Sequence, residues 1–228
     1  MIYLVIDLFF RLGICCYFFA AQLSKKESEM QEIPFKIVPV LVLEELDIGL
    51  KMCECLCENG LPIAEITFRS EIAEKLIRET VKRFPEMLVG AGTILNLIDL
   101  KRAFDAGAKF AVTPGLNAKI VEEAQKCNYH FIPGVCTPSE IEQAYELGCR
   151  FLKFYPAEAA GGTTMLKSLI APYKHLGIKF MPTGGLTIDK AAEYLAIPEV
   201  RCIGGTWLGK NIPDWKKVSE TIRKAAEI

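Results

Sequence analysis

The sequence predicts an α/β protein, a (β/α)8 barrel of the short-loop form, and three observations support this prediction. The chain has 228 residues, of which 51% are hydrophobic, enough for one large domain with a sizeable core. From residue 36 onward one plan recurs: a short apolar run, turn residues, then a helical pattern. Successive runs begin 20 to 28 residues apart, which is the length of one strand with its crossover helix.

Each apolar run is expected to be a parallel strand whose last residues face the active site of the barrel. The runs are 36–41, 63–68, 88–93, 110–115, 130–135, 151–156, 179–184 and 200–205. Helical patterns over 44–58 and 71–84 lie between runs, and Thr137-Pro138-Ser139-Glu140 has the residues of a helix start. An open doubly wound sheet is the alternative. It is disfavoured because no GxGxxG follows the first run and because eight even units suit closure.

The first 31 residues stand outside this plan, so we expect an apolar extension with a polar linker over 1–31 and the barrel over 32–228. The stretch 1–23 is very apolar, but its longest uncharged run, 12–23, is short for a membrane span. It also lacks the basic start and cleavage site of a secretory signal. Three interpretations stay open: a non-native extension with Met30 as the true start, a weak signal or anchor, or a helix packed on the barrel or a partner.

Charge and cysteine content narrow the class of protein. The net charge of −1 favours neither nucleic acid nor an anionic membrane as a partner, so an anionic ligand needs a local site. The nine cysteines are odd in number and form no CxxC pair, which favours a reduced, cytoplasmic protein. Cys53, Cys55 and Cys57 invite a metal interpretation, but a helix would turn Cys55 away from the other two, so no metal site is predicted.

Lys153 is the sharpest chemical signal. It lies in the middle of a predicted strand, and strand alternation places Phe151, Lys153 and Tyr155 on one face. Apolar surroundings disfavour the ammonium form, and the neutral amine is the species that forms a Schiff base. The alternative is a lysine that faces outward and extends between the helices with its charge in water.

Glu65, Thr67 and Arg69 alternate along the second run, so they share a face if that strand extends to residue 69. Glu65 could then move protons, directly or through a water, and Arg69 could bind a carboxylate with two parallel hydrogen bonds. The alternative is a structural ion pair in the mouth of the barrel.

Two glycine pairs follow adjacent predicted strands. Gly184-Gly185 ends the seventh unit, and Gly204-Gly205 with Thr206 ends the eighth. Barrels often bind a phosphate at these two strand ends, with backbone N–H groups that glycine lets come close to the anion. Glycine also closes tight turns, which is the alternative. A third pair, Gly161-Gly162, could cap the next helix or lie beside the phosphate.

Taken together, these segments resemble the KDPG/KHG aldolase family, that is, 2-keto-3-deoxy-6-phosphogluconate and 4-hydroxy-2-oxoglutarate aldolases. The resemblance covers the chain from about residue 34 onward. The segments that carry it are IVPVL (37–41), EITFR (65–69), GAGTILN (90–96), TPGLN (113–117), IPGVCTPSE (132–140), LKFYPAE (152–158), GG…LKSL (161–169), PTGGL (182–186) and CIGGTWL (202–208).

The resemblance implies a class I aldolase that needs no metal or cofactor, acts on a phosphorylated 2-keto acid and assembles as a homotrimer. It implies catalytic roles for Lys153, as the Schiff-base lysine, and for Glu65, as the proton-transfer group. The implied substrate-binding residues are Arg69, Thr93, Pro114 and Thr183, and the implied phosphate-binding residues are Gly184, Gly185, Gly205 and Thr206. The expected reaction is cleavage of 2-keto-3-deoxy-6-phosphogluconate to pyruvate and glyceraldehyde 3-phosphate, with 4-hydroxy-2-oxoglutarate as a second substrate.

Other functions remain as alternatives. The galactonate-derived isomer of the substrate differs at one stereocentre, which only the shape of the pocket can select. A phosphate-binding barrel isomerase or synthase would need no imine lysine, and a relative without activity would bind a ligand without turnover. This chain also departs from the family in having Tyr155 where phenylalanine is usual and Thr206 where serine is common, although neither change removes a catalytic group.

Overall fold

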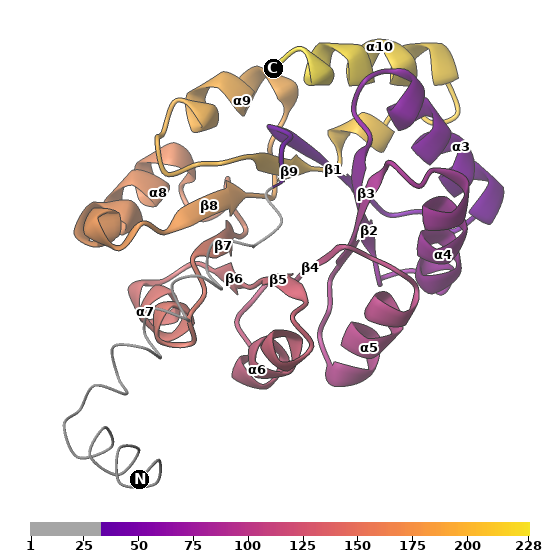
Figure 1. The fold of residues 1–228 in the computed structure, drawn as a ribbon. Helices are drawn as coiled ribbons and strands as arrows, with labels where there is room; N and C mark the ends of the chain where they lie inside the picture. Colours follow the sequence, from indigo (N-terminus) through magenta and orange to yellow (C-terminus); the bar gives the residue numbers. More distant parts are fainter. Residues whose placement is uncertain (1–32) are drawn as a thin grey trace, which may run out of the picture. The chain divides into compact units, whose positions relative to one another are not determined.

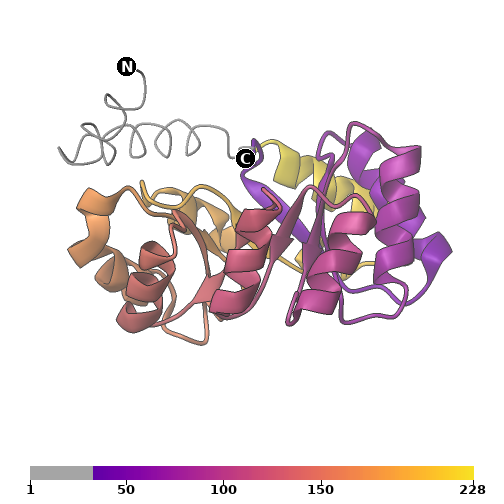
Figure 2. The same ribbon diagram turned by 60° about the horizontal axis from the view of Figure 1, so that its bottom comes forward.

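The computed structural model describes residues 33–228, and this part of the chain forms a closed barrel of parallel strands surrounded by helices (Figure 1). The predicted extension and linker over 1–31 lie outside the described residues. In the tilted view of Figure 2, helices flank the strands on both sides. The barrel prediction is confirmed, and the open doubly wound sheet is excluded.

Strands and helices alternate along the chain, as the repeated plan predicts. The strands are β1 (Ile37–Leu41), β2 (Ile63–Thr67), β3 (Leu88–Gly92), β4 (Phe110–Val112), β5 (His130–Ile132), β6 (Gly134–Val135), β7 (Phe151–Phe154), β8 (Lys179–Pro182) and β9 (Ile203–Gly205). The α-helices are α3 (Leu46–Glu58), α4 (Ala73–Arg83), α5 (Leu97–Asp105), α6 (Ala118–Lys126), α7 (Pro138–Glu146), α8 (Gly162–Ile170), α9 (Ile188–Leu195) and α10 (Trp215–Ala226). Residues 33–228 also contain two short 3₁₀ segments, η2 (Ala171–Leu176) and η3 (Trp207–Gly209).

Two ladders of parallel strands make the wall of the barrel, in the orders β5-β4-β3-β2-β1-β9 and β6-β7-β8. The fifth predicted run is divided into β5 and β6 by Pro133, because proline has no N–H to donate to a ladder. Bridges between Phe180 and Val200 and between Thr183 and Gly204 join β8 to β9 and close the circle.

The interior of the barrel is filled by side chains rather than open. Gly90 on β3 stands opposite Phe110 on β4, and a Cβ on Gly90 would lie 2.2 Å from the Phe110 ring. The missing side chain therefore makes room for a fully buried phenylalanine, in the way that barrels pair small and large residues across neighbouring strands.

The helices bury one face against this wall. In α4 the buried residues include Leu76, Ile77 and Thr80, at the helical spacing expected from the sequence. The predicted start of α7 is confirmed as a capping box, in which Thr137 and Glu140 satisfy each other's backbone N–H groups.

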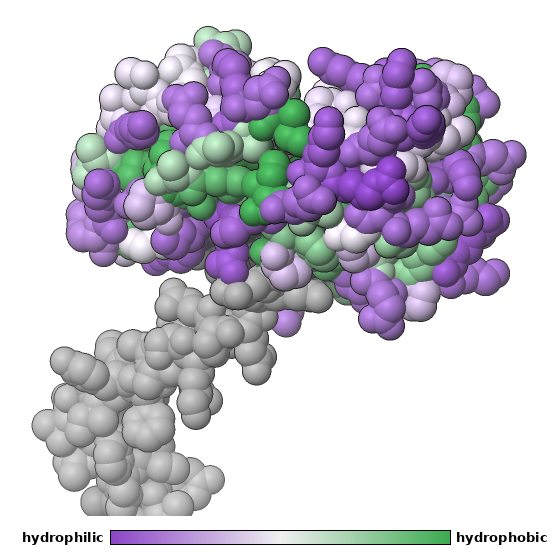
Figure 3. All heavy atoms as spheres, turned by 90° about the horizontal axis from the view of Figure 1, so that it is seen from above, coloured by the Kyte–Doolittle hydropathy of each residue, from purple (hydrophilic) through white to green (hydrophobic). Residues whose placement is uncertain are grey.

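The outer surface is mixed. The side of the molecule seen in Figure 3 is largely hydrophilic, with hydrophobic residues gathered in a band across it. Within residues 33–228, no helix combines the length and the apolar character that crossing a membrane requires.

Candidate active site

The candidate site is built around Lys153 on β7 and Glu65 on β2, whose side chains meet inside the barrel. The Nζ atom of Lys153 lies 3.2 Å from Oε1 and 3.5 Å from Oε2 of Glu65. Both residues are almost completely buried, with exposed fractions of 5% for Lys153 and 1% for Glu65. Lys153 therefore faces inward, and the outward-facing alternative is wrong.

A glycine on the neighbouring strand leaves room for this pair. A Cβ on Gly92 of β3 would lie 2.2 Å from Oε1 of Glu65, so only glycine allows the carboxylate its position. Gly134 of β6 stands in register with Lys153, but a Cβ on Gly134 would meet the backbone of Pro114 and not the lysine. The position of the Glu65 carboxylate thus depends on the missing side chain of Gly92.

Each member of the buried pair is the charge partner of the other. Among residues 33–228, Lys153 is the only hydrogen-bonding partner of the Glu65 carboxylate. A buried charge that loses its partner typically costs about 3–5 kcal/mol of stability. Replacement of Lys153 by alanine would therefore weaken the fold as well as any reaction, and a variant that keeps the positive charge is the better probe.

Arg69 does not share a strand face with Glu65, which corrects one expectation. β2 ends at Thr67, and Arg69 lies exposed in the turn that follows. The Phe68 N–H still donates to the carbonyl of Gly92, the last residue of β3, at 2.8 Å, but the chain turns at Phe68 and Arg69. Thr67 is buried and donates to the Leu41 carbonyl at 3.0 Å, so its hydroxyl links β2 to β1. Arg69 therefore stands at the rim that a ligand would enter.

Thr93 and Pro114 follow β3 and β4 at the same end of the barrel. Thr93 has a φ of 60°, which is rare for a β-branched residue and is a form of strain that clusters at functional sites. The carbonyl oxygen of Pro114 would lie 2.1 Å from a Cβ on Gly134, so the backbones of these loops are in close contact. Both residues are half-buried beside the strand ends.

The two glycine turns lie next to each other, because Thr183 after β8 pairs with Gly204 of β9. Thr183 is buried, whereas Gly184 and Gly185 have φ angles of 107° and 78°, which favour glycine. Thr206 follows β9 and is exposed at the start of η3.

The space beside Gly205 is filled by an aromatic ring. A Cβ on Gly205 would lie 1.7 Å from the ring of Trp207, so the indole occupies the space of the missing side chain. The backbone of this second turn is thereby held in place by its own neighbour in sequence.

Sequence reasoning missed the cluster that supports the first glycine turn. The backbone N–H of Glu158 donates to the carbonyl of Gly184 at 3.0 Å. The Glu158 carboxylate accepts from Tyr194 at 2.6 Å and also from Lys190, both on α9. Glu158 stands within the LKFYPAE segment, but Tyr194 and Lys190 are more than 30 residues away. No local pattern could therefore have identified the cluster.

The other polar features lie away from this site. The Thr80 hydroxyl of α4 donates a hydrogen bond to the Cys53 sulfur of α3, at 3.5 Å. Cys55 of α3 and Ser219 of α10 share another hydrogen bond, at 3.1 Å. Across the described residues 33–228, no group of three or more His, Cys, Asp or Glu side chains is placed to hold a metal ion.

Comparison with known proteins identifies the family to which this chain is similar. The model for the KDPG and KHG aldolase family matches residues 27–221. The 2-dehydro-3-deoxy-phosphogluconate aldolase of Haemophilus influenzae is 43% identical over 197 residues, which are 85% of this chain and 92% of that protein.

Two solved structures are similar throughout the barrel. The 2-keto-3-deoxy-6-phosphogluconate aldolase of Zymomonas mobilis, in a structure with 3-phosphoglycerate, is 35% identical with a TM-score of 0.80, and the match covers 84% of this chain and 91% of that one. The KDPG aldolase of Legionella pneumophila, with pyruvate captured as a covalent carbinolamine intermediate, is 33% identical with a TM-score of 0.78 over 84% and 94% of the chains. This chain belongs to the KDPG and KHG aldolase family, whose members are lyases.

Proposed function

We propose that this enzyme is a class I aldolase that cleaves 2-keto-3-deoxy-6-phosphogluconate to pyruvate and glyceraldehyde 3-phosphate through a Schiff base on Lys153. The observation that carries the proposal is the buried contact between Lys153 and Glu65, with 3.2 Å between Nζ and Oε1. This pairing brings a nucleophilic amine within hydrogen-bonding reach of an acid/base group, as covalent catalysis by lysine requires. The covalent pyruvate adduct of the Legionella relative supports the same chemistry.

The first half of the reaction forms the imine. A proton moves from Nζ of Lys153 to Glu65, and the neutral amine attacks the C2 ketone of the substrate. Glu65 returns the proton as the carbinolamine loses its hydroxyl group as water. The product is a protonated imine that joins Nζ to C2.

The second half breaks the carbon–carbon bond. The protonated imine accepts the electrons of the C3–C4 bond while Glu65 takes the proton of the C4 hydroxyl, and glyceraldehyde 3-phosphate leaves as the aldehyde. Glu65 then gives this proton to C3 of the remaining enamine, which restores the protonated imine. Water then hydrolyses the imine, which releases pyruvate and restores the amine of Lys153.

The ends of the substrate are assigned to opposite sides of the lysine. In this proposal Arg69 binds the carboxylate from the rim, and Thr93, Pro114 and Thr183 border the pyruvate portion. The phosphate is bound by backbone N–H groups of Gly184, Gly185 and Gly205 together with the hydroxyl of Thr206. Support comes from the adjacent positions of the two glycine turns and from the positive φ angles of Gly184 and Gly185.

A second substrate, 4-hydroxy-2-oxoglutarate, fits the same mechanism, because it also carries a C2 ketone and a C4 hydroxyl group. Its cleavage would yield pyruvate and glyoxylate. The name of the matching family includes this activity. The galactonate-derived isomer is the competing substrate, and a direct comparison of the two phosphorylated acids distinguishes the epimers.

The test replaces each member of the pair by a residue of similar size and polarity. Lys153→Arg keeps a positive charge beside Glu65 but cannot form an imine, so cleavage of the phosphorylated acid should be abolished. Glu65→Gln should lower kcat by about 10²- to 10⁴-fold, the usual contribution of a general acid/base. Lys101→Arg, at an exposed lysine on α5, is the control and should leave activity unchanged. Cleavage near the native rate in folded Lys153→Arg protein would overturn the proposal.

We also propose that the enzyme is a homotrimer in the cytoplasm. The side chains of Leu95, Leu97 and Ile98, after β3, are exposed by 56%, 46% and 73%. Neighbouring apolar side chains of this kind favour burial between subunits. All seven cysteines within residues 33–228 are free thiols, which is consistent with a reducing compartment.

A further inference from the structure

Tyr155 lies between the lysine and the first glycine turn. It directly follows β7, and the centroid of its ring is 5.7 Å from Nζ of Lys153, within the range of a cation–π contact. Two ring atoms, Cδ2 and Cε2, lie 3.2 Å from the point where a Cβ on Gly184 would stand. A ligand that extends from Nζ to this turn must therefore pass along the Tyr155 side chain.

The hydroxyl of Tyr155 is available to such a ligand. The side chain is 38% exposed, and its ring stays near Nζ of the buried Lys153 although Tyr155 lies beyond the end of β7. Among the described residues 33–228, none forms a hydrogen bond with this hydroxyl. A phenol both donates and accepts, and a ring packed against the Gly184 backbone presents its hydroxyl at a defined position.

We propose that the Tyr155 hydroxyl forms a hydrogen bond with the C5 hydroxyl of the substrate and so selects acceptor aldehydes that carry a hydroxyl next to the aldehyde carbon. This inference rests on the proposed function, in which Glu65 serves the C4 hydroxyl and the glycine turns bind the phosphate on C6. The C5 hydroxyl is the polar group between those two positions, and Tyr155 is the side chain between the corresponding parts of the site. Tyr155 is thus a specificity-determining residue rather than a group that moves protons in the reaction.

The test combines one variant with two substrates. Tyr155→Phe removes the hydroxyl but keeps the ring that packs on Gly184. The aldol condensation of pyruvate is measured with glyceraldehyde 3-phosphate and with 3-oxopropyl phosphate, which lacks the hydroxyl in question. Tyr155→Phe should lower kcat/KM for glyceraldehyde 3-phosphate about 3- to 10-fold, the range of one neutral hydrogen bond, and leave the value for 3-oxopropyl phosphate unchanged. An equal change for both aldehydes, or no change for either, would overturn the inference.

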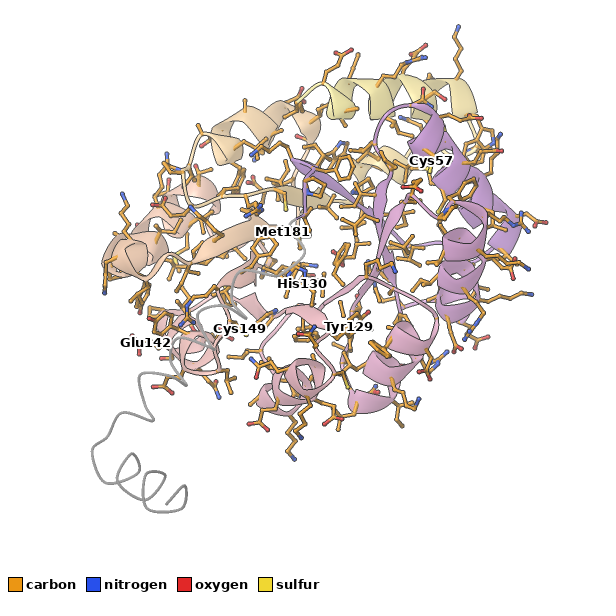
Figure 4. All side chains as sticks on the ribbon, viewed as in Figure 1. Cys57, Tyr129, His130, Glu142, Cys149 and Met181 are labelled. Atoms are coloured by element: carbon orange, nitrogen blue, oxygen red, sulfur yellow. The ribbon has the colours of Figure 1, made fainter. Side chains whose placement is uncertain are left out.

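Tyr173→Phe is the matched control. The Tyr173 hydroxyl on η2 donates to Glu142 of α7 at 2.8 Å, on the outside of the barrel (Figure 4). Removal of this hydroxyl should change neither aldehyde's kcat/KM. If Tyr173→Phe reproduced the selective loss, the effect would not belong to the site and the inference would be wrong.

Borohydride trapping of pyruvate separates this inference from the proposed function. Native protein and Tyr155→Phe should trap pyruvate on Lys153 equally, because pyruvate carries no group that corresponds to C5. Absence of trapping in native protein would contradict the proposed function itself. Equal trapping together with unchanged preference between the two aldehydes would defeat the Tyr155 inference alone.

Discussion

The central residues are two buried side chains that form an ion pair inside the barrel, Lys153 and Glu65. In the proposed reaction Lys153 supplies the amine and Glu65 exchanges protons with it. Strand alternation predicted that Lys153 shares a face with Phe151 but left open whether this face is the inner one, and the contact with Glu65 decides it. The position of Arg69 could not be predicted, because the alternating pattern runs on to residue 69 whereas the chain turns at Phe68 and Arg69.

His130 is a partly buried ionisable residue that makes stability depend on pH. It is the first residue of β5, so it lies at the end of the strands opposite the site, and Figure 4 shows it toward the barrel centre. Burial, with a smaller effect of the Arg201 charge, lowers the pKa of His130 from 6.5 to about 4. The folded state therefore favours neutral His130. This contribution is fully present above pH 6.5 and is lost as the pH falls toward 4.

We predict that His130→Phe makes the free energy of unfolding less sensitive to acid. In native protein, protonation of His130 should remove up to about 3 kcal/mol between pH 6.5 and 4. A phenylalanine has no such cost and can keep the ring contact with Phe151. Urea unfolding of both proteins at pH 7 and pH 4.5 measures the difference, with His175→Phe as the control. Parallel pH dependence in native and His130→Phe protein would contradict this account.

At the scale of helices and strands, the features that depend on neighbouring residues could be predicted, and those that depend on distant segments could not. The helix spans over 44–58 and 71–84 were predicted to within two residues, because apolar spacing and helix ends are local properties. The division of the fifth run was missed, since the effect of Pro133 appears only when the ladders on both sides are known. The Glu158 cluster was missed for the same reason: it joins a loop to a helix far along the chain.

The capping box at the start of α7 gives a prediction at this scale. Thr137→Ala removes the side chain that accepts from the Glu140 N–H and should lower the free energy of unfolding by about 1 kcal/mol. Ser139→Ala, in the same first turn but not at the cap, should have a much smaller effect. Urea unfolding measures both variants. An equal loss in the two would show that the capping box does not stabilise this helix start.

For the whole molecule, the predicted boundary at residue 32 has a direct consequence. All residues assigned to the reaction lie between Glu65 and Thr206, and Ile33 is the first residue described and is buried. A protein that begins at residue 32 should therefore keep the kcat and KM of the full chain. Steady-state kinetics of both forms test this prediction. A large rise in KM or loss of folding in the shorter form would assign residues 1–31 a role in the barrel.

The proposed trimer also belongs to this scale. Ile98→Asp places a charge in the exposed apolar group after β3 and should disrupt an interface formed there, because a buried unpaired charge is costly. Light scattering should give three times the mass of one chain for native protein and a smaller mass for the variant. Lys101→Asp, nearby on α5 but at a charged position, should leave the mass unchanged. A native monomer, or an Ile98→Asp trimer, would contradict the proposal.

The central claim is the imine between pyruvate and Lys153, and it is tested most directly by chemical trapping. The protein is incubated with pyruvate and sodium borohydride, its intact mass is measured, and the modified residue is located by peptide digestion. The account predicts that one reduced pyruvate is added per chain, on Lys153, and that Lys153→Arg gains none. A folded native protein that gains no mass, or an adduct on another lysine, would contradict it.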